Sequence, residues 1–445
     1  MAHRRRLPRD PVEAEVTDLN HEGRGVAHVE GKAVFVAGAL AGERVRMRYT
    51  RRHRRWDEAR LEEVLRPAPE RIAPGCPHFG VCGGCSLQHL SPQDQLRFKS
   101  GVLAEQFRHI GGVEPERWLE PLEGPVWGYR GKARLAAKYV ARKGDRVLVG
   151  FREQASPYVA DLSRCPVLHP AVGERLEALA ALVRSLDIHD RVPQIEVAAG
   201  DDTVGLVFRN LEPLGDADRE RLAAFGREHG FAVFQQPGNE STVAPVGPGA
   251  PELCYALPAH DVSLAFRPTD FTQVNARINR AMVDRALELL APGPADRVLD
   301  LFCGLGNFTL PLARRAGEVL GLEGEAGLVE RAWGNARRNG IANARFQVAD
   351  LAHPEAGAAW AGEDISLALL DPPRSGAAAV LAPLAAAHPR RILYVSCGPA
   401  TLARDAGSLV REHGYRLAAA GVMDMFPHTA HVESIALFLA PGEVA

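Results

Sequence analysis

Residues 296–313, with the sequence DRVLDLFCGLGNFTLPLA, decide the fold of this chain. Within them, residues 297–301 are a short apolar run that carries one acid, Asp300, as in a buried parallel strand. Residues 302–307 carry two glycines and predict a tight turn, and residues 308–315 predict the helix that follows. A strand, a glycine turn and a helix in this order form the first unit of a nucleotide-binding α/β sheet.

The turn differs from the two common phosphate-binding loops. Thr309 stands where the third glycine of the dinucleotide fingerprint would be, and the Lys-Ser/Thr pair of a P-loop is missing. S-adenosylmethionine (AdoMet) fits better, because it carries no phosphate and needs only the close backbone approach that Gly304 and Gly306 allow. Glu323 ends the next apolar run, where its carboxylate can hold the ribose hydroxyls. The turn and the two acids beside it predict an AdoMet site.

Length and composition indicate a multidomain globular protein. The chain has 445 residues, of which 46% are hydrophobic and 24% charged, enough for two or three domains with separate cores. No apolar run reaches transmembrane length, and the arginine-rich start is not followed by an apolar segment. We therefore expect a cytoplasmic protein without a membrane partner, and a monomer.

Residues 12–67 predict a small β-barrel, because short alternating runs are separated by Gly, Asn and Asp. Small barrels with basic rims often bind oligonucleotides. Seven arginines and no acid lie between positions 44 and 55. They predict a phosphate-facing patch that includes Arg51, Arg52, Arg54 and Arg55, although an ordinary solvated surface has the same composition.

A cysteine triplet follows the barrel. Cys76, Cys82 and Cys85 lie within one short loop that also contains two glycines. Cys165 is the candidate for a fourth ligand, and four thiolates suit either zinc or an iron–sulfur cluster. Zinc ribbons usually show two close pairs, so a triplet with one distant cysteine favours [4Fe-4S]. The spacing differs from that of radical AdoMet enzymes.

The rest of the chain predicts a helix and two further regions. Residues 91–112 have a Ser cap, a Pro at the first helical position and Gly-Gly at the end. Residues 126–266 contain strand-like runs with helices near 169–186 and 216–230. From Phe266 onward, strands and helices alternate in the pattern of a doubly wound sheet that finishes with an antiparallel pair.

Several polar residues close the predicted strands, where ligands of such sheets bind. Asp350 could meet the adenine, and Asp371 and Cys397 would face the methyl group. An acidic-Pro-Pro motif also occurs in amino-group methyltransferases, which place an aromatic residue after the prolines. Arg374 occupies that position here, so the motif favours a different reaction.

A cysteine at the end of a strand suggests covalent catalysis on a pyrimidine. Uracil C5 is a poor nucleophile, but addition of a thiolate to C6 creates an enolate whose C5 can attack a sulfonium methyl. A base must then remove the C5 proton. Glu433 is the available carboxylate, with Cys397 as the nucleophile. The competing interpretation makes Cys397 a small buried residue.

The motifs together resemble a known family. Residues 20–26, NHEGRGV, are similar to the opening of the TRAM domain, an RNA-binding module. With the cysteine set, residues 271–275 (FTQVN), the AdoMet turn and the SCGPATLARD and HVES segments, the chain resembles TRAM-containing iron–sulfur RNA (uracil-5-)-methyltransferases. The family more often has Asn and Thr where Gly398 and Ser434 stand here. The resemblance implies that Cys397 is the nucleophile and Glu433 the base; that Gln273, Phe302, Asn307, Glu323, Asp350 and Asp371 bind AdoMet or line its site; and that Phe271, Asn275 and Arg374 contact RNA.

Family analogy also predicts the architecture and the substrate. We expect a TRAM β-barrel over residues 1–68, an iron–sulfur and central α+β domain over 69–266, and an α/β methyltransferase domain over 267–445. Helix 91–112 is expected to pack on the last of these. Having both TRAM and the cysteines, the chain is most similar to the group that methylates uracil 1939 of 23S ribosomal RNA. A transfer-RNA uridine, amino-group methylation and a non-catalytic RNA-binding or assembly factor are the alternatives.

Overall fold

The computed structural model describes residues 7–8, 10–141, 144–249, 251–353, 355 and 359–443, and the chain divides into two compact units. The predicted domain limits at residues 68 and 266 stay a prediction. The first unit comprises Met1–Lys99, Phe151–Ala160 and Phe426–His431, and the second comprises Ser100–Gly150, Asp161–Met425 and Val432–Ala445.

The first unit contains the predicted barrel. Its strands close in the order β1-β2-β3-β5-β4, with a parallel pairing between β3 and β5. Alternate residues such as Val34, Val36, Val45 and Met47 point inward and are fully buried, because successive side chains of a strand face opposite sides. The strands are β1 (Val12–Leu19), β2 (Gly25–Val29), β3 (Lys32–Ala37), β4 (Arg44–Arg52) and β5 (Trp56–Arg66).

A buried carboxylate holds the barrel to the segment that follows it. Glu43 is fully buried and accepts hydrogen bonds from the Leu40 N–H at 2.8 Å, the Ala68 N–H at 3.3 Å and the Arg71 guanidinium. Burial alone would raise the pKa of Glu43, but Arg71 and these amides lower it below its usual range. The carboxylate is therefore charged and fully partnered.

The second unit contains a mixed sheet in the order β12-β11-β10-β9-β7-β8. The strand-like runs predicted here are confirmed, but the helix predicted over 169–186 is split. Gly173 ends its first turn against the backbone of Cys165, where an added Cβ would lie 2.3 Å from the carbonyl oxygen. The elements are β7 (Lys132–Val140), β8 (Arg146–Gly150), β9 (Gln194–Ala199), β10 (Val204–Arg209), β11 (Phe231–Gln236), β12 (Ala244–Pro245), α2 (Pro170–Gly173), α3 (Leu176–Ser185) and α4 (Asp216–His229).

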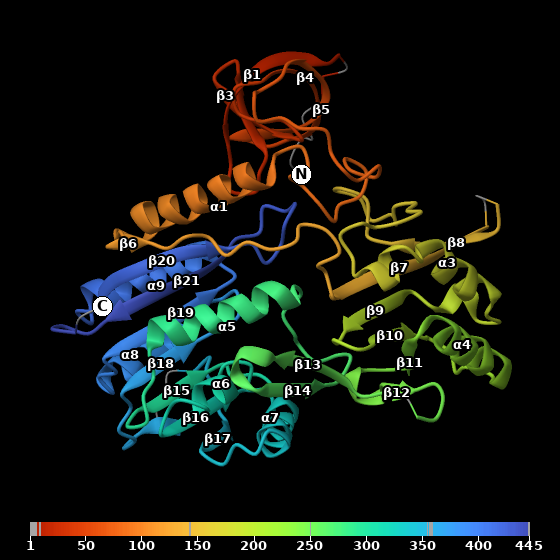
Figure 1. The fold of residues 1–445 in the computed structure, drawn as a ribbon. Coiled ribbons are helices and arrows are strands. Elements are labelled where there is room, and N and C mark those ends of the chain that lie inside the picture. The colour runs from red at the N-terminus through yellow and green to blue at the C-terminus, as the bar shows by residue number, and fades with distance from the viewer. Residues whose placement is uncertain are drawn as a thin grey trace. The chain divides into compact units, whose positions relative to one another are not determined.

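A larger sheet of the same unit has the order β17-β16-β15-β18-β19-β21-β20-β6 (Figure 1). Strands β17 to β19 are parallel, and β21 runs antiparallel between β19 and β20. The doubly wound α/β fold is thus confirmed. The strands are β6 (Arg117–Trp118), β15 (Arg297–Leu301), β16 (Glu318–Glu323), β17 (Ala344–Val348), β18 (Leu367–Leu370), β19 (Arg391–Ser396), β20 (Arg416–Met423) and β21 (Glu433–Leu439).

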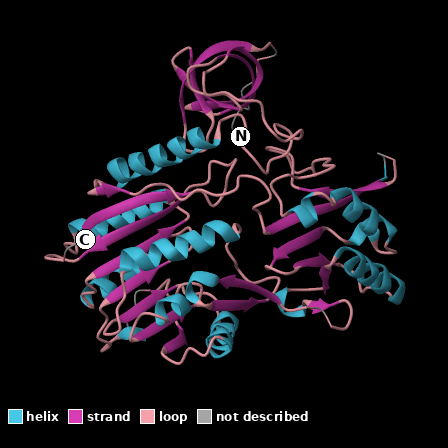
Figure 2. Ribbon diagram, in the orientation of Figure 1, coloured by secondary structure: helices cyan, strands magenta, loops and turns pink. Residues whose placement is uncertain are grey.

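Helices flank this sheet, as Figure 2 shows. In addition, a hairpin that the sequence did not predict, β13 (Leu253–Leu257) with β14 (Val262–Phe266), is held by side chains of α7: Asn335 accepts from the Ala265 N–H at 2.9 Å. The helices are α5 (Ala276–Leu290), α6 (Thr309–Ala313), α7 (Ala326–Arg338), α8 (Ala378–Ala386) and α9 (Pro399–Arg411). Among the described helices, none combines the length and the apolar character needed to cross a membrane.

The helix predicted over 91–112 is present as α1 (Pro92–Gln106) and a π-helical turn at Phe107–Gly111. It ends at Gly112, whose φ of 61° is the left-handed conformation that glycine tolerates. The turn packs on α9: Arg411 donates to the Gly111 carbonyl, and a Cβ on Gly111 would lie 2.7 Å from the Ala403 oxygen.

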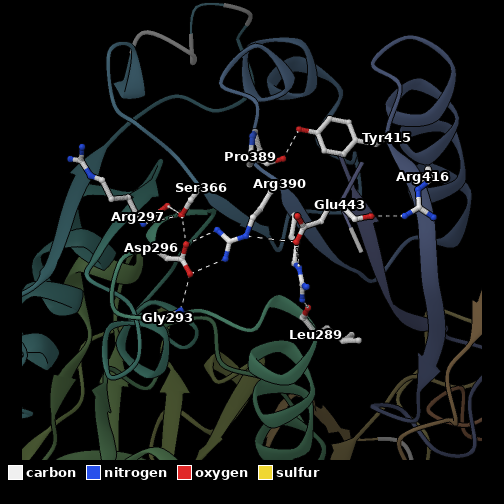
Figure 3. Close-up of polar contacts among 11 residues, drawn as sticks. Leu289, Gly293, Asp296, Arg297, Ser366, Pro389, Arg390, Tyr415, Arg416 and Glu443 are labelled. Carbon is white, nitrogen blue, oxygen red and sulfur yellow. Dashed lines mark hydrogen bonds and ion pairs between the residues drawn. The ribbon is translucent and has the colours of Figure 1, made fainter. Parts of the chain in front are cut away.

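The start of β15 is held by one carboxylate (Figure 3). Asp296 accepts hydrogen bonds from the Gly293 N–H at 2.8 Å, the Ser366 hydroxyl at 2.8 Å and the Arg390 guanidinium at 3.0 Å. The Arg390 hydrogen bonds lower the pKa of Asp296 to about 2, against the opposing effect of partial burial. This network joins the segments that enter β15, β18 and β19, and thus holds the strands whose far ends carry the candidate site.

Candidate active site

The glycine turn lies between the carboxyl ends of β15 and β16. Phe302, Gly304 and Gly306 have positive φ values of 64°, 54° and 91°, so the chain bends sharply as it leaves β15. The Gly304 N–H donates to Glu323 Oε2 at 3.1 Å. The structure thus brings together the turn and the acid that the sequence assigns to AdoMet, at the edge where α/β sheets bind ligands.

A second acid lies beneath the turn. Asp300 is fully buried; its Oδ2 accepts the Thr309 hydroxyl at 2.5 Å, and its Oδ1 has no hydrogen-bond partner among the described residues. Burial raises the pKa of Asp300 to about 7; the Thr309 hydrogen bond opposes this rise and the charge of Glu323 adds to it. An acceptor of this kind suits a cationic or hydrogen-bonding ligand.

Two residues that the sequence did not single out position Asn307. Its amide forms a reciprocal pair with Asn279 at 2.9 and 3.0 Å, and it also accepts the Tyr255 hydroxyl at 3.0 Å. Asn279 lies one helical turn after Asn275 on the same face of α5, a spacing that could have indicated it. Tyr255 lies on the unpredicted hairpin, and no sequence pattern indicated it.

The reacting pair is brought together by the register of β19 and β21. Ser396 pairs with Ser434 across the two antiparallel strands, so the next opposed positions are Cys397 and Glu433. Residues opposite each other in such a pair have side chains on the same face, about 5 Å apart at Cβ. Glu433 is 8% exposed and Cys397 half-buried. A thiol and a carboxylate therefore face one another at the carboxyl end of β19.

The surroundings of Cys397 oppose its ionisation. Burial raises the pKa of the thiol to about 11, the charges of Glu433 and Asp371 add to the rise, and the Arg374 guanidinium, hydrogen-bonded to the thiol, opposes it. Burial, together with the charges of Glu433 and Asp300, raises the pKa of Asp371 well above its usual range. The site thus places two carboxyl groups and one guanidinium around the sulfur.

The other predicted contacts lie around this core. The Phe271 side chain is 69% exposed, as a base-contacting aromatic requires. Asn275 caps α5 by accepting the Ile278 N–H at 3.3 Å. Asp350 follows β17 and is 62% exposed, with its carboxylate bonded to the Ala352 N–H and to His353. Gln273 lies on the segment between Phe271 and Asn275.

The predicted arginine patch is narrower than its sequence indicates, because half of it is neutralised within the barrel. The stretch from 44 to 55 contains no acid, but glutamates of neighbouring strands lie across from β4. Arg51, Arg54 and Arg55 are exposed, and Arg52 lies 3.5 Å from Asp57 and over the ring of Tyr49. The paired arginines are Arg44 and Arg46 with Glu13, Arg46 also with Glu63, and Arg48 with Glu62.

The cysteine loop is fixed by backbone pairing within the first unit. The Gly83 N–H donates to the Arg152 carbonyl at 2.8 Å, and the Gln154 N–H donates to the Val81 carbonyl at 2.8 Å. Cys82 Sγ accepts the Gly84 N–H at 3.4 Å. Within the part of the chain that the structure describes, no cluster of three or more His, Cys, Asp or Glu side chains is arranged to hold a metal ion.

Comparisons with known proteins agree with this geometry. The family model described as tRNA (Uracil-5-)-methyltransferase matches residues 255–440, and the TRAM domain model matches residues 5–55. The 23S rRNA (uracil(1939)-C(5))-methyltransferase of Alkalilimnicola ehrlichii is 66% identical over 98% of both chains, and that of Nitrosococcus oceani is 56% identical over 98% of this chain and 99% of its own.

The chain belongs to the 23S rRNA (uracil(1939)-C(5))-methyltransferase family. It is therefore an enzyme of the RNA methyltransferase class with an N-terminal TRAM domain, and the predicted family is confirmed. The fold agrees with the crystal structure of Pyrococcus abyssi tRNA (uracil-54, C5)-methyltransferase in complex with S-adenosyl-L-homocysteine. That structure aligns with a TM-score of 0.75 at 24% identity, over 96% of this chain and 99% of the other.

Proposed function

We propose that this protein transfers the methyl group of AdoMet to C5 of uracil 1939 in 23S ribosomal RNA. The observation that supports this proposal most directly is the register of β19 and β21, which continues from Ser396 opposite Ser434 to Cys397 opposite Glu433, whose charge acts on the thiol. The pair lies at the same sheet edge as the glycine turn and Glu323. Full-length relatives named for this reaction add the choice of RNA.

The chemistry follows from the placement of the two groups. Bound AdoMet supplies an electrophilic methyl group. The Cys397 thiolate forms a bond to C6, and the electrons of the C5–C6 double bond move toward the C4 oxygen. C5 then takes the methyl group, whose bonding electrons stay with the departing sulfur. Glu433 removes the C5 proton, the double bond forms again and the cysteine sulfur is released as a thiolate.

The free thiol must lose its proton as substrate binds, because its pKa is about 11. Arg374 is the group that favours the thiolate, since it is hydrogen-bonded to the sulfur and carries the opposite charge. Burial raises the pKa of Asp371, which favours its protonated form, and this form repels the thiolate less than the charged form would. We therefore assign Arg374 to activation of Cys397 as well as to RNA contact.

The remaining residues are assigned to binding. We infer that Glu323 holds the ribose hydroxyls of AdoMet, since its Oε2 accepts only one backbone amide and keeps further acceptor capacity, while Oε1 accepts two. Phe271 and the exposed arginines Arg51, Arg54 and Arg55 are proposed to contact RNA, with Arg52 at their edge. Gln273, Phe302, Gly304, Gly306, Asn307, Asp350 and Asp371 are proposed to bind AdoMet or to line its site.

We further propose that Cys76, Cys82, Cys85 and Cys165 hold a [4Fe-4S] cluster. The N–H donated to Cys82 Sγ is the kind of bond that stabilises a thiolate ligand. Gly84 keeps the loop close, because a Cβ there would lie 3.2 Å from the Phe151 ring. Protein purified without oxygen is expected to be brown with about four irons per chain. A colourless, zinc-loaded and fully active protein would overturn the iron assignment.

The decisive experiment separates the two reacting groups by the stage at which the reaction stops. Cys397→Ala should bind RNA and AdoMet but form neither adduct nor product. Glu433→Gln should accumulate a covalent protein–RNA complex that carries labelled methyl and survives denaturing electrophoresis. RNA with 5-fluorouridine at the target should trap the wild type at the same stage, because fluorine cannot leave as a cation. Turnover by Cys397→Ala, or no adduct in either trap, would contradict the mechanism.

Mapping of 5-methyluridine in cells with and without the gene tests the choice of RNA. We expect the mark to be lost at uracil 1939 of 23S RNA and retained in transfer RNA. Loss from transfer RNA instead would favour a transfer-RNA substrate, as in the name of the matching family and of the Pyrococcus abyssi enzyme. With a ribosomal substrate we also expect a cytoplasmic enzyme that acts as a monomer.

A further inference from the structure

A pocket of about 380 Å³ lies in the second unit beside the candidate active site. One wall is the segment 272–280, which follows Phe271 and includes the start of α5. The opposite walls come from residues 125–131, the start of α2 and the end of β9. Backbone bonds fix these walls: the Gly131 N–H donates to Val274 at 2.7 Å, and the His169 N–H donates to Arg130 at 2.9 Å. The pocket is thus preformed.

Two buried polar atoms of the lining lack partners within the described residues. Asn275 is 1% exposed, and while its Oδ1 caps α5, its Nδ2 has no hydrogen-bond partner. His169 Nδ1 is likewise buried and unpartnered. Burial lowers the pKa of His169, so its ring is neutral. Since buried polar atoms are almost always satisfied in native structures, these two indicate a ligand with complementary hydrogen-bonding groups.

The rest of the lining has the chemistry of a nucleotide site. Trp127 is 37% exposed and offers an aromatic face. Arg277 is exposed at the first turn of α5. An aromatic ring on which a base stacks, an arginine for phosphate and a few directed polar atoms are the groups with which proteins bind unpaired nucleotides.

The pocket is separate from the AdoMet turn. Its lining contains neither the turn residues 302–306 nor Glu323, and much of it comes from the central sheet rather than the methyltransferase sheet. It adjoins the cofactor side through Gln273, which lines the pocket and is proposed to bind AdoMet, and through Asn279 and Tyr255, which hold Asn307. The same short segment carries Phe271, which is exposed and expected to contact the target base, and Asn275, which is buried and lines this pocket.

We propose that the pocket binds a second, unpaired nucleotide of the substrate RNA, one that flanks the methylated uridine. This inference rests on the proposed function. Trp127 stacks on the base, and Asn275 Nδ2 donates a hydrogen bond to an acceptor on the edge of that base. His169 Nδ1 forms a hydrogen bond with a neighbouring group, and Arg277 forms an ion pair with the phosphate. Binding of a flanking nucleotide helps to hold the target out of the stack, since the energy of unstacking is offset by a second set of contacts.

The test combines base deletion in the RNA with matched protein variants. Asn275→Ser replaces the amide group, including Nδ2, by a hydroxyl whose oxygen can still cap α5. Trp127→Ala removes the stacking face, and Trp127→Phe restores an aromatic ring. Each protein is titrated, with S-adenosylhomocysteine present, against a target-loop RNA and against copies that carry one abasic nucleotide at each position flanking the uridine. AdoMet affinity is measured separately by calorimetry.

For the wild type we expect one flanking abasic position to weaken RNA binding by roughly tenfold to a hundredfold. Asn275→Ser and Trp127→Ala should weaken binding of the intact RNA. Their affinity should fall little further when the RNA is abasic at that one position, whereas Trp127→Phe should recover most of the affinity for the intact RNA. AdoMet affinity should stay unchanged.

The proposal would be overturned if the loss of RNA affinity caused by a protein variant simply added to the loss caused by an abasic nucleotide at every flanking position. It would also be overturned if both variants lost AdoMet affinity, because the pocket would then be part of the cofactor site. These outcomes are independent of the proposed function. Formation of 5-methyluridine by the wild type is scored on the intact RNA and would stand even if the pocket had no role.

Discussion

Buried acids at the barrel and at the candidate active site differ in their partners. In the first unit, Glu43 is surrounded by Arg71 and backbone amides, and its pKa is lowered despite full burial. At the candidate site in the second unit, burial raises the pKa of Asp300 to about 7, and its Oδ1 has no hydrogen-bond partner among the described residues. Burial also raises the pKa of Asp371 well above its usual range. An acid that serves the fold is provided with partners by the protein, whereas Asp300 keeps one oxygen open for a ligand.

The largest effect is expected from removing the charge of Glu43. Glu43→Gln leaves the partly buried Arg71 without its counter-charge, which costs up to about 3–5 kcal/mol of unfolding free energy, the cost of breaking a fully buried pair. Asp371→Asn is the matched control, because the raised pKa of Asp371 favours its neutral form, so the exchange should change stability by less than about 1 kcal/mol while lowering methylation. Denaturant unfolding and a methylation assay measure both. If the two variants were equally destabilised, Glu43 and Asp371 would not differ in their contribution to the stability of the fold.

A smaller effect is expected at the AdoMet turn. Glu323→Ala should weaken AdoMet binding by about 1–3 kcal/mol, because the hydrogen-bond partners of a bound ligand are left unpaired. Glu325→Ala serves as control, since that residue lies two positions further along at the start of α7. Isothermal calorimetry measures both affinities. An unchanged affinity for Glu323→Ala would move the cofactor site elsewhere.

Asp296 extends the comparison to pH, because it is a fully partnered acid in the second unit. Its pKa is about 2 when folded and about 3.9 when unfolded, so its contribution is present above pH 4 and is lost as the pH falls toward 2. Because Arg390 is partly exposed, we expect a contribution of about 1–2 kcal/mol. Asp296→Asn should lower stability at pH 7 by this amount and flatten the acid side of the stability profile. If the stability of the variant falls with decreasing pH in parallel with that of the wild type, the acid dependence does not come from Asp296.

The smallest effect per residue is expected on the barrel surface. Replacing Arg51, Arg54 and Arg55 by Gln should weaken RNA binding by less than about 1 kcal/mol each and reduce the salt slope by about 0.7 for each phosphate that is no longer neutralised. The matched set is Arg44, Arg46 and Arg48, whose charges are already paired with glutamates. If both sets have the same effect on RNA binding, ion pairing does not decide which arginines meet the RNA.

Local patterns were sufficient to predict most of the fold. Alternating runs in the barrel and the strand–turn–helix unit around Gly304 depend on neighbouring residues, so their elements appear where the sequence indicates. Strand termini also placed Glu323, Asp371 and Cys397 at one sheet edge. The residues offered Glu433 as the available carboxylate and the family resemblance assigned it the same role, but its position opposite Cys397 depends on β21 entering between β19 and β20, a choice of register that local sequence does not contain.

The errors and omissions arose from contacts with other segments. The arginines of β4 looked unpaired because their glutamates lie on β1 and β5. Tyr255 was missed because the strand that carries it is short and its hydroxyl is directed by Asn307, fifty-two residues later. The helix predicted over 169–186 breaks where Gly173 meets the backbone of Cys165. In each case the deciding partner lies outside the segment whose pattern made the prediction.

The insertion of β21 also has a consequence for biosynthesis. Both of its neighbours, β19 and β20, are translated before it. A growing chain that stops short of residue 433 therefore has two strands with facing unpaired edges, which invite association with other chains. It also has a nucleophile without its base. Synthesis of β21 adds Glu433, the proton acceptor, and fills the gap in the sheet at the same time. Partly made chains therefore cannot finish the reaction on the RNA around them.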